Sequence, residues 1–253
     1  MKPRAGTVYL VGAGPGAPDL LTLRAARLIE RADIVFHDAL VHPDTIALAA
    51  RAITVAVGKR HGAHSTAQVF INKRLIDAAR RHAVVVRLKG GDPMLFGRAQ
   101  EELDALDAAG IACEVVPGVT AAQAAAAELR VSLTRRGISR SVAFATPRVG
   151  RDESPSDWSA ALTRADTAVL YMAANEAAPV AARLLALGRP RDWPVAIVES
   201  ASLKGKREFM TLEALARDGA GARSGPTLIL FGEVLRDALA RADAVPERHC
   251  VAA

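Results

Sequence analysis

The chain of 253 residues is poor in the residues on which several classes of protein depend. Its only two cysteines, Cys113 and Cys250, are too few for a disulfide scaffold, and neither lies in a metal-ligand spacing. No apolar run approaches the roughly 20 residues of a membrane helix, and the N-terminus lacks the apolar core of a signal peptide. We therefore expect a soluble, cytoplasmic protein without a bound metal and without a membrane contact.

Aromatic residues make up only 4% of the chain, although its net charge is +6 and its isoelectric point is about 9.8. Such a charge suggests an acidic partner, but no basic helix, zinc spacing or aromatic RNA-binding motif is present, so we expect no nucleic-acid partner. Basic residues instead gather in one stretch, at Arg130, Arg135, Arg136, Arg140, Arg148 and Arg151. This stretch is interpreted as the lining of a site for a small polyanion, with a solvated linker as the alternative.

Hydrophobic residues reach 51%, and short apolar runs alternate with helical patterns in the first half of the chain. Strands are predicted at residues 7–12, 33–36, 53–57, 83–88 and 113–116. Helices are predicted at residues 18–31, 43–50, 66–82, 98–109 and 121–129. Nearly continuous apolar strands separated by helices are typical of a mainly parallel sheet that is covered on both faces.

The apolar pattern lapses at SLTRRGIS, residues 132–139, which we interpret as a domain boundary. Beyond it, strands are predicted at residues 142–146, 167–172, 195–199, 208–211 and 227–231, with helices only at 176–187 and 233–242. Consecutive strands with few helices between them predict a mixed sheet. The sequence therefore predicts an α/β protein of two domains, residues 1–133 with a mainly parallel sheet and residues 140–253 with a mixed sheet.

The segment GAGPGAPD, residues 12–19, follows the first predicted strand and precedes a helix. It formally matches the dinucleotide-binding pattern G-x-G-x-x-G/A. Asp38, at the end of the next strand, corresponds to the acidic residue of that pattern. Pro15 argues against this interpretation because it removes an N–H from the turn that would hold a pyrophosphate, and Pro18 delays the helix. A dinucleotide site and a plain glycine turn both stay open for this motif alone.

Three further segments follow predicted strands. RLKGGDP, residues 87–93, has two glycines that let a ligand approach the backbone, and Asp92 can pair with an amino group, so a ligand site is favoured over a structural turn. GKRHGAH, residues 58–64, offers cations and imidazoles in no metal-ligand pattern, which indicates surface or substrate contacts. PGVTA, residues 117–121, is explained on its own by Thr120 capping a helix.

Together and in this order, these segments resemble the uroporphyrinogen-III C-methyltransferases of the tetrapyrrole methylase superfamily. The matching stretches of the first half are VYLVGAGPGAPDLLTLRAARLIERADIVFHDALV, VGKRHGAHS, VVRLKGGDPMLFGRAQEE and EVVPGVTAA. Those of the second half are TAVLYM, PVAIVESAS and GPTLILFGEV. The resemblance runs from about Gly6 to Arg236, and KGGDPxxFGR with GKR upstream is its most specific part.

The resemblance implies the two-domain tetrapyrrole methylase fold, a homodimer, and an active site in the cleft between the domains. It implies S-adenosylmethionine as cofactor, S-adenosylhomocysteine as its product, no metal, and a polycarboxylate tetrapyrrole as substrate. The reaction would be methylation of uroporphyrinogen III at C2 and C7 to precorrin-2, for sirohaem or cobalamin synthesis. Such chemistry needs alignment of an already electrophilic methyl group with a pyrrole carbon, and a carboxylate that then takes a proton.

Residue by residue, the resemblance implies that Asp38 is the proton acceptor and Lys59 the proton donor, whereas the alternative for Asp38 is a structural aspartate that caps the next turn. The implied cofactor contacts are Pro15, Gly90, Gly91, Asp92, Leu95, Thr120, Ala121, Met172 and Ala201. The arginines expected to hold substrate carboxylates are Arg98, Arg135, Arg136 and Arg148.

The chain departs from the family pattern at several positions that face the substrate there. His37 and Ala39 flank Asp38 in place of Tyr and Arg, Arg135 stands for a histidine, and Pro147-Arg148 replaces Gly-His. Three alternatives therefore stay open: a sister methyltransferase acting on another precorrin, a non-catalytic cofactor-binding regulator, and a dinucleotide-dependent oxidoreductase.

Overall fold

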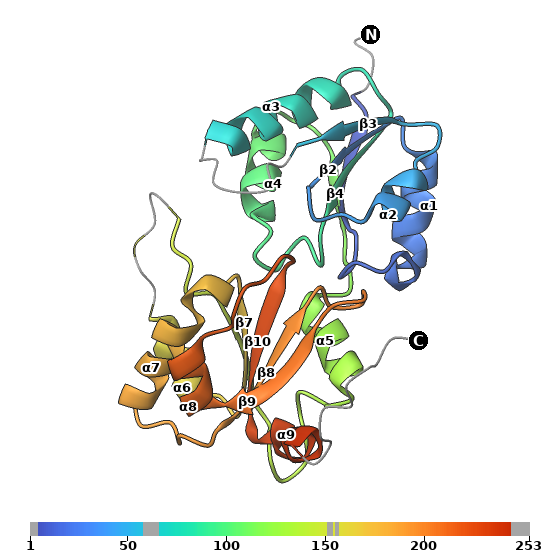
Figure 1. Ribbon diagram of the computed structural model, residues 1–253. Helices are drawn as coiled ribbons and strands as arrows, with labels where there is room; N and C mark the ends of the chain where they lie inside the picture. Colours follow the sequence, from blue (N-terminus) through green and yellow to red (C-terminus); the bar gives the residue numbers. More distant parts are fainter. Residues whose placement is uncertain (1–4, 58–65, 151–153, 155–156, 244–253) are drawn as a thin grey trace, which may run out of the picture. The chain divides into compact units, whose positions relative to one another are not determined.

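The computed structural model describes residues 5–57, 66–150, 154 and 157–243 (Figure 1). By its contacts the chain divides into two compact units, residues 1–121 and 122–253. Helix α5 (Ala121–Leu129) therefore groups with the second unit, although its residues precede the boundary expected at 132–139. The domain limits 1–133 and 140–253 stay a prediction.

A five-stranded sheet in the order β3-β2-β4-β1-β5 forms the centre of the first unit. Its strands are β1 (Thr7–Gly12), β2 (Ile34–His37), β3 (Ile53–Ala56), β4 (Val84–Lys89) and β5 (Cys113–Val116). All neighbouring strands run parallel, which confirms the predicted parallel sheet. All five carboxyl ends therefore lie at one edge, which we call the carboxyl edge of the first sheet.

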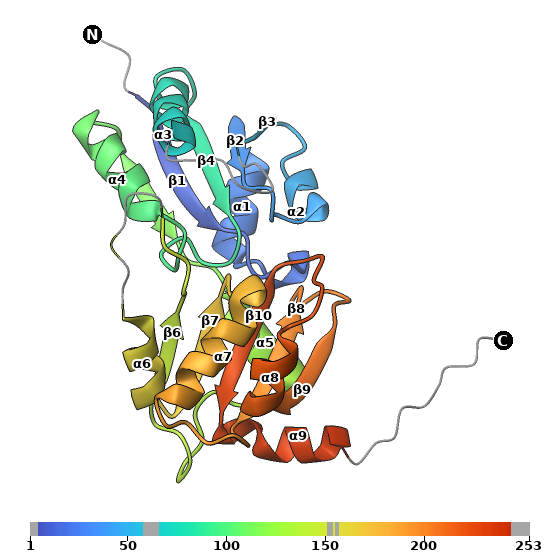
Figure 2. The same cartoon turned by 60° about the vertical axis from the view of Figure 1, so that its left-hand side comes forward.

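Helices cover both faces of this sheet, as its apolar strands predict (Figures 1 and 2). They are α1 (Leu23–Arg31), α2 (Pro43–Ala47), α3 (Thr66–Ala79) and α4 (Ala99–Ala108). Leu75 of α3 and Leu106 of α4 pack in one core with Leu10 of β1. Ile29 of α1 packs in a second core with Val11, the next residue of the same strand that points to the opposite face.

The start of α1 differs from the prediction of a helix over residues 18–31. A short 3-10 turn, η1 (Pro18–Leu20), comes first, and α1 begins only at Leu23. Thr22 has an extended backbone, and its hydroxyl oxygen accepts the N–H of Ala25 at 3.1 Å. The threonine cap, not the proline, therefore sets the helix start.

The second unit contains a mixed sheet in the order β6-β7-β10-β8-β9, as predicted. Its strands are β6 (Val142–Ala145), β7 (Thr167–Tyr171), β8 (Pro194–Glu199), β9 (Arg207–Thr211) and β10 (Thr227–Gly232). Strands β6 and β7 are parallel, and the other neighbours are antiparallel. Strands β6, β7 and β8 therefore end at the same edge, which we call the β7 edge of the second sheet.

The helices of the second unit include two that the sequence pattern did not predict, α6 (Trp158–Arg164) and α8 (Leu212–Asp218). The others are α5, α7 (Ala177–Ala186) and α9 (Arg236–Asp243), with the 3-10 turns η2 (Ala174–Glu176) and η3 (Glu233–Leu235). Each missed helix has only 7 residues, too few for a helical period to stand out. Both pack with α7 on one face through buried leucines such as Leu162 and Leu215.

Candidate active site

Three turns meet at the carboxyl edge of the first sheet, where β1, β4 and β5 end. The N–H of Ala13 donates to the carbonyl of Lys89 at 2.7 Å. Gly14 and Gly91 exchange two hydrogen bonds, of 3.2 Å from the Gly14 N–H and 2.7 Å from the Gly91 N–H. The segments GAGPG and KGGDP, far apart in sequence, are therefore joined backbone to backbone.

The glycines of these turns serve two different purposes. A Cβ on Gly12 would lie 2.6 Å from the Cα of Gly118, and one on Gly118 would lie 2.4 Å from the carbonyl oxygen of Gly91. These two positions need glycine because the turns touch. A Cβ on Gly91 would meet no atom of the described chain within 4 Å, and one on Gly90 only a Leu40 carbon at 3.5 Å. The backbone at 90–91 thus borders open space that a ligand can enter.

The carboxylate of Asp92 fastens two of the turns together. One oxygen accepts the N–H of Met94 at 2.8 Å, and the other accepts the N–H of Gly118 at 2.9 Å. The sequence indicated only a contact between Asp92 and a ligand amino group. Each carboxylate oxygen has a second lone pair, so the structural role and that proposed contact are compatible.

The dinucleotide interpretation of residues 12–19 requires a helix that starts at the glycines, so that its first N–H groups face a pyrophosphate. Here η1 and the extended Thr22 intervene, and α1 begins at Leu23. The geometry of this turn therefore argues against a dinucleotide site.

Asp38, directly after β2, lies at the exposed end of a row of buried charges. Its Oδ1 accepts a hydrogen bond from Arg87 Nη2 at 2.5 Å. Arg87 Nε and Lys89 Nζ each donate to one oxygen of Glu102 at 3.0 Å. Gln68 adds a third donor to Glu102 at 3.2 Å. The Glu102 side chain is 0% exposed and those of Arg87 and Lys89 are 3% exposed, against 31% for Asp38.

The electrostatics of this row depend on burial and on pairing. Burial alone would lower the pKa of Arg87, but Asp38 and Glu102 outweigh it and raise that pKa above its usual value. The pKa of Lys89 is lowered, first by burial and then by the adjacent charge of Arg87, against the attraction of Glu102. Buried charges of this kind are costly to desolvate, so their presence at a sheet edge indicates a functional constraint.

Sequence reasoning did not identify Arg87, Lys89 or Glu102 as site residues. A signal was present, because Arg87 and Lys89 alternate in the otherwise apolar strand VVVRLK and so point to the same face of the sheet. Two cations on one buried face require a carboxylate opposite them. Glu102, on the buried side of α4, is that carboxylate.

In the second unit, two expected cofactor contacts lie at the β7 edge. Met172 follows β7 and has a φ of +57°, while Ala201, after β8, is flanked by Ser200 at +52° and Ser202 at +71°. Left-handed backbone is strained for residues other than glycine and is found preferentially at functional sites. The N–H of Ser202 donates to Glu128 of α5 at 2.6 Å, which holds the turn.

Glu199, the last residue of β8, stabilises the same turn from its other side. Its carboxylate accepts the hydroxyl of Ser224 at 2.9 Å and the N–H groups of Ser224 and Gly225 at 2.8 Å. These bonds, the Ser224 hydroxyl first, hold the pKa of Glu199 below its usual value. A buried carboxylate at the end of β8 therefore holds the loop of Ser224 and Gly225 beside the turn that contains Ala201.

The arginines expected to bind substrate do not form one cluster within this unit. Arg135 and Arg136 precede β6, and the Arg135 guanidinium donates to Asp237 at 2.8 Å. Arg148 follows β6, whose four residues span about 13 Å. Strand β6 therefore lies between the two ends of the basic stretch, and its interpretation as the lining of one site stays a prediction. Arg98, in the first unit, directly precedes α4 and pairs with both oxygens of Glu101, at 2.6 and 2.7 Å.

The remaining expected site residues lie as follows. Lys59 lies outside the described residues, and with it the whole segment 58–64. Pro15 follows Gly14 in the first turn, and half-buried Leu95 donates its N–H to the carbonyl of Asp92 at 3.3 Å. Thr120 and Ala121 lead into α5.

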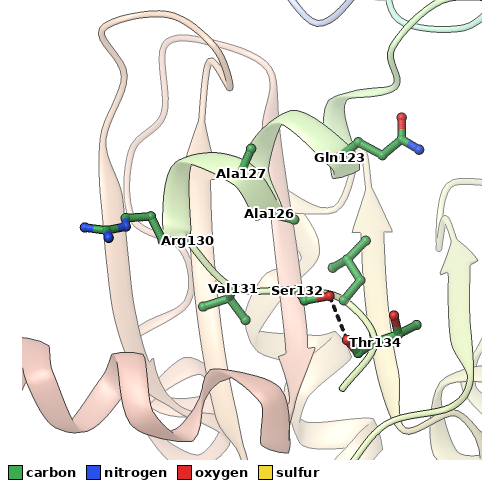
Figure 3. A pocket seen from close by; sticks show the side chains of 8 residues that line it. Gln123, Ala126, Ala127, Arg130, Val131, Ser132 and Thr134 are labelled. Atoms are coloured by element: carbon green, nitrogen blue, oxygen red, sulfur yellow. Dashed lines mark hydrogen bonds between the residues drawn. The ribbon is translucent and has the colours of Figure 1, made fainter. Parts of the chain in front are cut away.

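Two open pockets of about 400 Å³ lie in the second unit. Figure 3 shows the first, along one side of α5 and the loop after it, lined by residues that include Gln123, Arg130 and Thr134. Arg130 of the basic stretch is among its lining residues, but none of them is an expected cofactor contact. The second is lined by an expected substrate contact, Arg135, together with residues such as Ile138 and Asp237. These pockets therefore do not mark the expected cofactor contacts.

Over the described ranges, no three or more His, Cys, Asp or Glu side chains are grouped as a metal site would require. No helix in the same ranges is long and apolar enough to cross a membrane.

Residues 7–216 match the family described as Tetrapyrrole (Corrin/Porphyrin) Methylases. The chain belongs to this family. It is 45% identical to the uroporphyrinogen-III C-methyltransferase of Pseudomonas aeruginosa, over 92% of this chain and 96% of that protein. It is 44% identical to siroheme synthase 1 of Klebsiella pneumoniae over 91% of this chain, which spans about half (49%) of that longer protein.

A solved structure shares the fold. The uroporphyrin-III C-methyltransferase of Thermus thermophilus, crystallised with S-adenosylhomocysteine, matches with a TM-score of 0.81 and 40% identity, over 92% of this chain and 100% of that one. The tetrapyrrole methylase fold is thus common to both proteins.

The two kinds of glycine should respond differently to alanine. Gly12→Ala is expected to lower the free energy of unfolding by about 1–3 kcal/mol, because its Cβ would lie 2.6 Å from Gly118. Gly90→Ala, which makes only an ordinary contact with Leu40, should change it by less than about 0.5 kcal/mol. Urea denaturation followed by circular dichroism measures both, and equal losses would contradict the distinction.

Proposed function

We propose that this protein is an S-adenosylmethionine-dependent methyltransferase that acts on uroporphyrinogen III. The observation that carries the proposal is the juxtaposition of an open glycine backbone at 90–91 with the Asp38 carboxylate at the end of the neighbouring strand. The Asp38 N–H donates to Leu88, the residue two before Gly90, at 3.2 Å. The identity of 45% to the Pseudomonas aeruginosa enzyme supports the choice of substrate.

The first unit offers a fitting surface for the cofactor. Gly90 and Gly91 leave room at the sheet edge, and Asp92 retains lone pairs for an ammonium group. The proposed contacts are Pro15, Gly90, Gly91, Asp92, Leu95, Thr120 and Ala121 in the first unit, and Met172 and Ala201 in the second. The solved relative with S-adenosylhomocysteine supports this choice of ligand.

When bound, S-adenosylmethionine supplies an electrophilic methyl group on a sulfonium that leaves as a neutral thioether. The pyrrole carbon that accepts the methyl group becomes part of a cationic ring, which returns to neutrality when one proton leaves. Asp38 is proposed to take that proton on its carboxylate, and Lys59 is proposed as the proton donor. The glycine turns position the reactants, since alignment is the main requirement of the transfer.

We further propose that two methyl groups are added, at C2 and C7, to give precorrin-2, and that the protein is a homodimer. The match to about half of a siroheme synthase supports a place in sirohaem synthesis. Arg98, Arg135, Arg136 and Arg148 remain the proposed partners of the substrate carboxylates. Of these, Arg148 is favoured within the second unit because it follows β6 at the β7 edge, where Met172 and Ala201 lie.

The cofactor proposal predicts that S-adenosylhomocysteine binds and NAD does not. Gly91→Ala should weaken S-adenosylhomocysteine binding at least about tenfold, because its methyl group enters the space left for the ligand. Gly137→Ala is the matched control, since both glycines have positive φ, +67° and +81°, and a Cβ on either meets no described atom within 4 Å. Titration calorimetry measures the affinities; NAD binding without S-adenosylhomocysteine binding would refute the proposal.

Asp38→Asn should lower the methylation rate about 10²–10⁴-fold, because asparagine cannot accept the proton. Binding of S-adenosylhomocysteine should persist. Asp44→Asn, at an exposed aspartate of α2, is the control and should leave the rate unchanged. Single-turnover assays with uroporphyrinogen III measure the rates. If the folded Asp38→Asn variant binds cofactor and keeps most of the wild-type rate, Asp38 is only a structural residue.

A further inference from the structure

We infer that Arg87 is the positioning residue of the reaction: it holds Oδ1 of Asp38 so that Oδ2 faces the substrate proton, and the buried Glu102 holds Arg87 in turn. This inference rests on the proposed function, in which Asp38 takes the proton. Arg87 is itself 2% exposed and lies within β4, so it acts through Asp38 and not through contact with the substrate.

The geometry fixes each member of the row in one direction. Arg87 Nη2 donates to Asp38 Oδ1, Nε to Glu102, and Nη1 to the carbonyl of Leu88 at 3.2 Å. All three guanidinium nitrogens therefore have a partner. Among the described residues, Asp38 Oδ2 accepts no hydrogen bond. A carboxylate anchored through one oxygen presents the other in a defined position, which proton transfer requires.

The charges of the row sum to zero, which explains how it is tolerated in the protein interior. Arg87 and Lys89 are the cations, and Asp38 and Glu102 are the carboxylates. Glu102 balances the charge of Lys89 and shares Arg87 with Asp38. If the row served stability alone, Glu102 and Lys89 would form a balanced pair without Arg87. Asp38 lies at the solvent end of the row and would then need no buried partner.

Lysine and arginine are not equivalent at the Arg87 position. A guanidinium has a planar fork that reaches Asp38 and Glu102 at once, whereas an ammonium group is a single point of charge on a flexible stem. Arg87→Lys therefore keeps the charge and loses the bridge. Arg87→Gln removes the charge and leaves Glu102 balanced by Lys89, so this variant buries no unpaired cation.

The test is a double-mutant cycle between Arg87 and Asp38 in the full chain. Arg87→Gln should lower kcat for uroporphyrinogen III methylation at least about tenfold, with KM and the S-adenosylhomocysteine affinity changed less than about threefold. In the Asp38→Asn background the same substitution should lower kcat no further. Arg87→Lys should show the same pattern with a smaller loss, and it replaces Arg87→Gln if the latter does not fold.

Arg189→Gln is the control for loss of a half-buried arginine. Arg189 Nη2 donates to three carbonyls at the end of α6, at 2.7–2.8 Å, and its guanidinium lies 4.2 Å from the centre of the Trp193 ring. This variant should lower the thermal midpoint and leave kcat unchanged at a temperature where it is folded. It therefore shows what destabilisation alone does.

The outcomes separate the inference from the proposed function. The role of Arg87 would be overturned if Arg87→Gln lowered kcat equally in the wild-type and in the Asp38→Asn background. It would also be overturned if Arg87→Gln left kcat unchanged while Asp38→Asn lowered it. A wild-type protein that does not methylate uroporphyrinogen III, or an Asp38→Asn variant with full activity, would overturn the proposed function and this inference with it.

Discussion

Glu102, a carboxylate with no solvent exposure, links three elements of the first unit. It lies on α4, pairs with Arg87 and Lys89 of β4, and through Arg87 reaches Asp38 at the end of β2. A carboxylate in this position requires these partners because an unpaired buried charge would be strongly destabilising. That requirement determines how α4 is placed against the carboxyl edge of the first sheet. The position of Asp38 follows from it as well.

The glycine turns complement this charge row with a second kind of rigidity. A Cβ on Gly12 or Gly118 would collide with backbone atoms of the adjacent turns, and Asp92 bonds two of the turns together. The carboxyl edge of the first sheet is therefore fixed in two ways. Hydrogen bonds and close packing hold the turns after β1, β4 and β5, and ion pairs hold the ends of β4 and β2. Such support from both sides is what a site needs if it is to hold reacting groups within a few tenths of an ångström.

Apolar runs and their spacing predicted buried strands such as β4, β7, β8 and β10 well, because a buried strand needs little beyond its own sequence. Helices α6 and α8 were not predicted, because a helix of two turns is too short to show a helical period. Helix α1 starts later in the chain than predicted because Thr22 caps it. The carboxyl-edge turns could be predicted from glycine, but the second role of Asp92 could not, since Gly118 is 26 residues away. Nearness in sequence does not by itself place the arginines of the basic stretch together, because β6 lies between Arg136 and Arg148.

The position of Asp38 at the end of the row also explains why the cation next to it is an arginine. A base that takes the proton from the methylated, cationic ring must stay ionised and keep one lone pair directed at that proton. A partner that could itself lose its proton or rotate would compromise both conditions. A guanidinium does neither, since it remains charged and its fork is held at all three nitrogens. The more adaptable ammonium of Lys89 accordingly lies behind it, where its task is to balance Glu102.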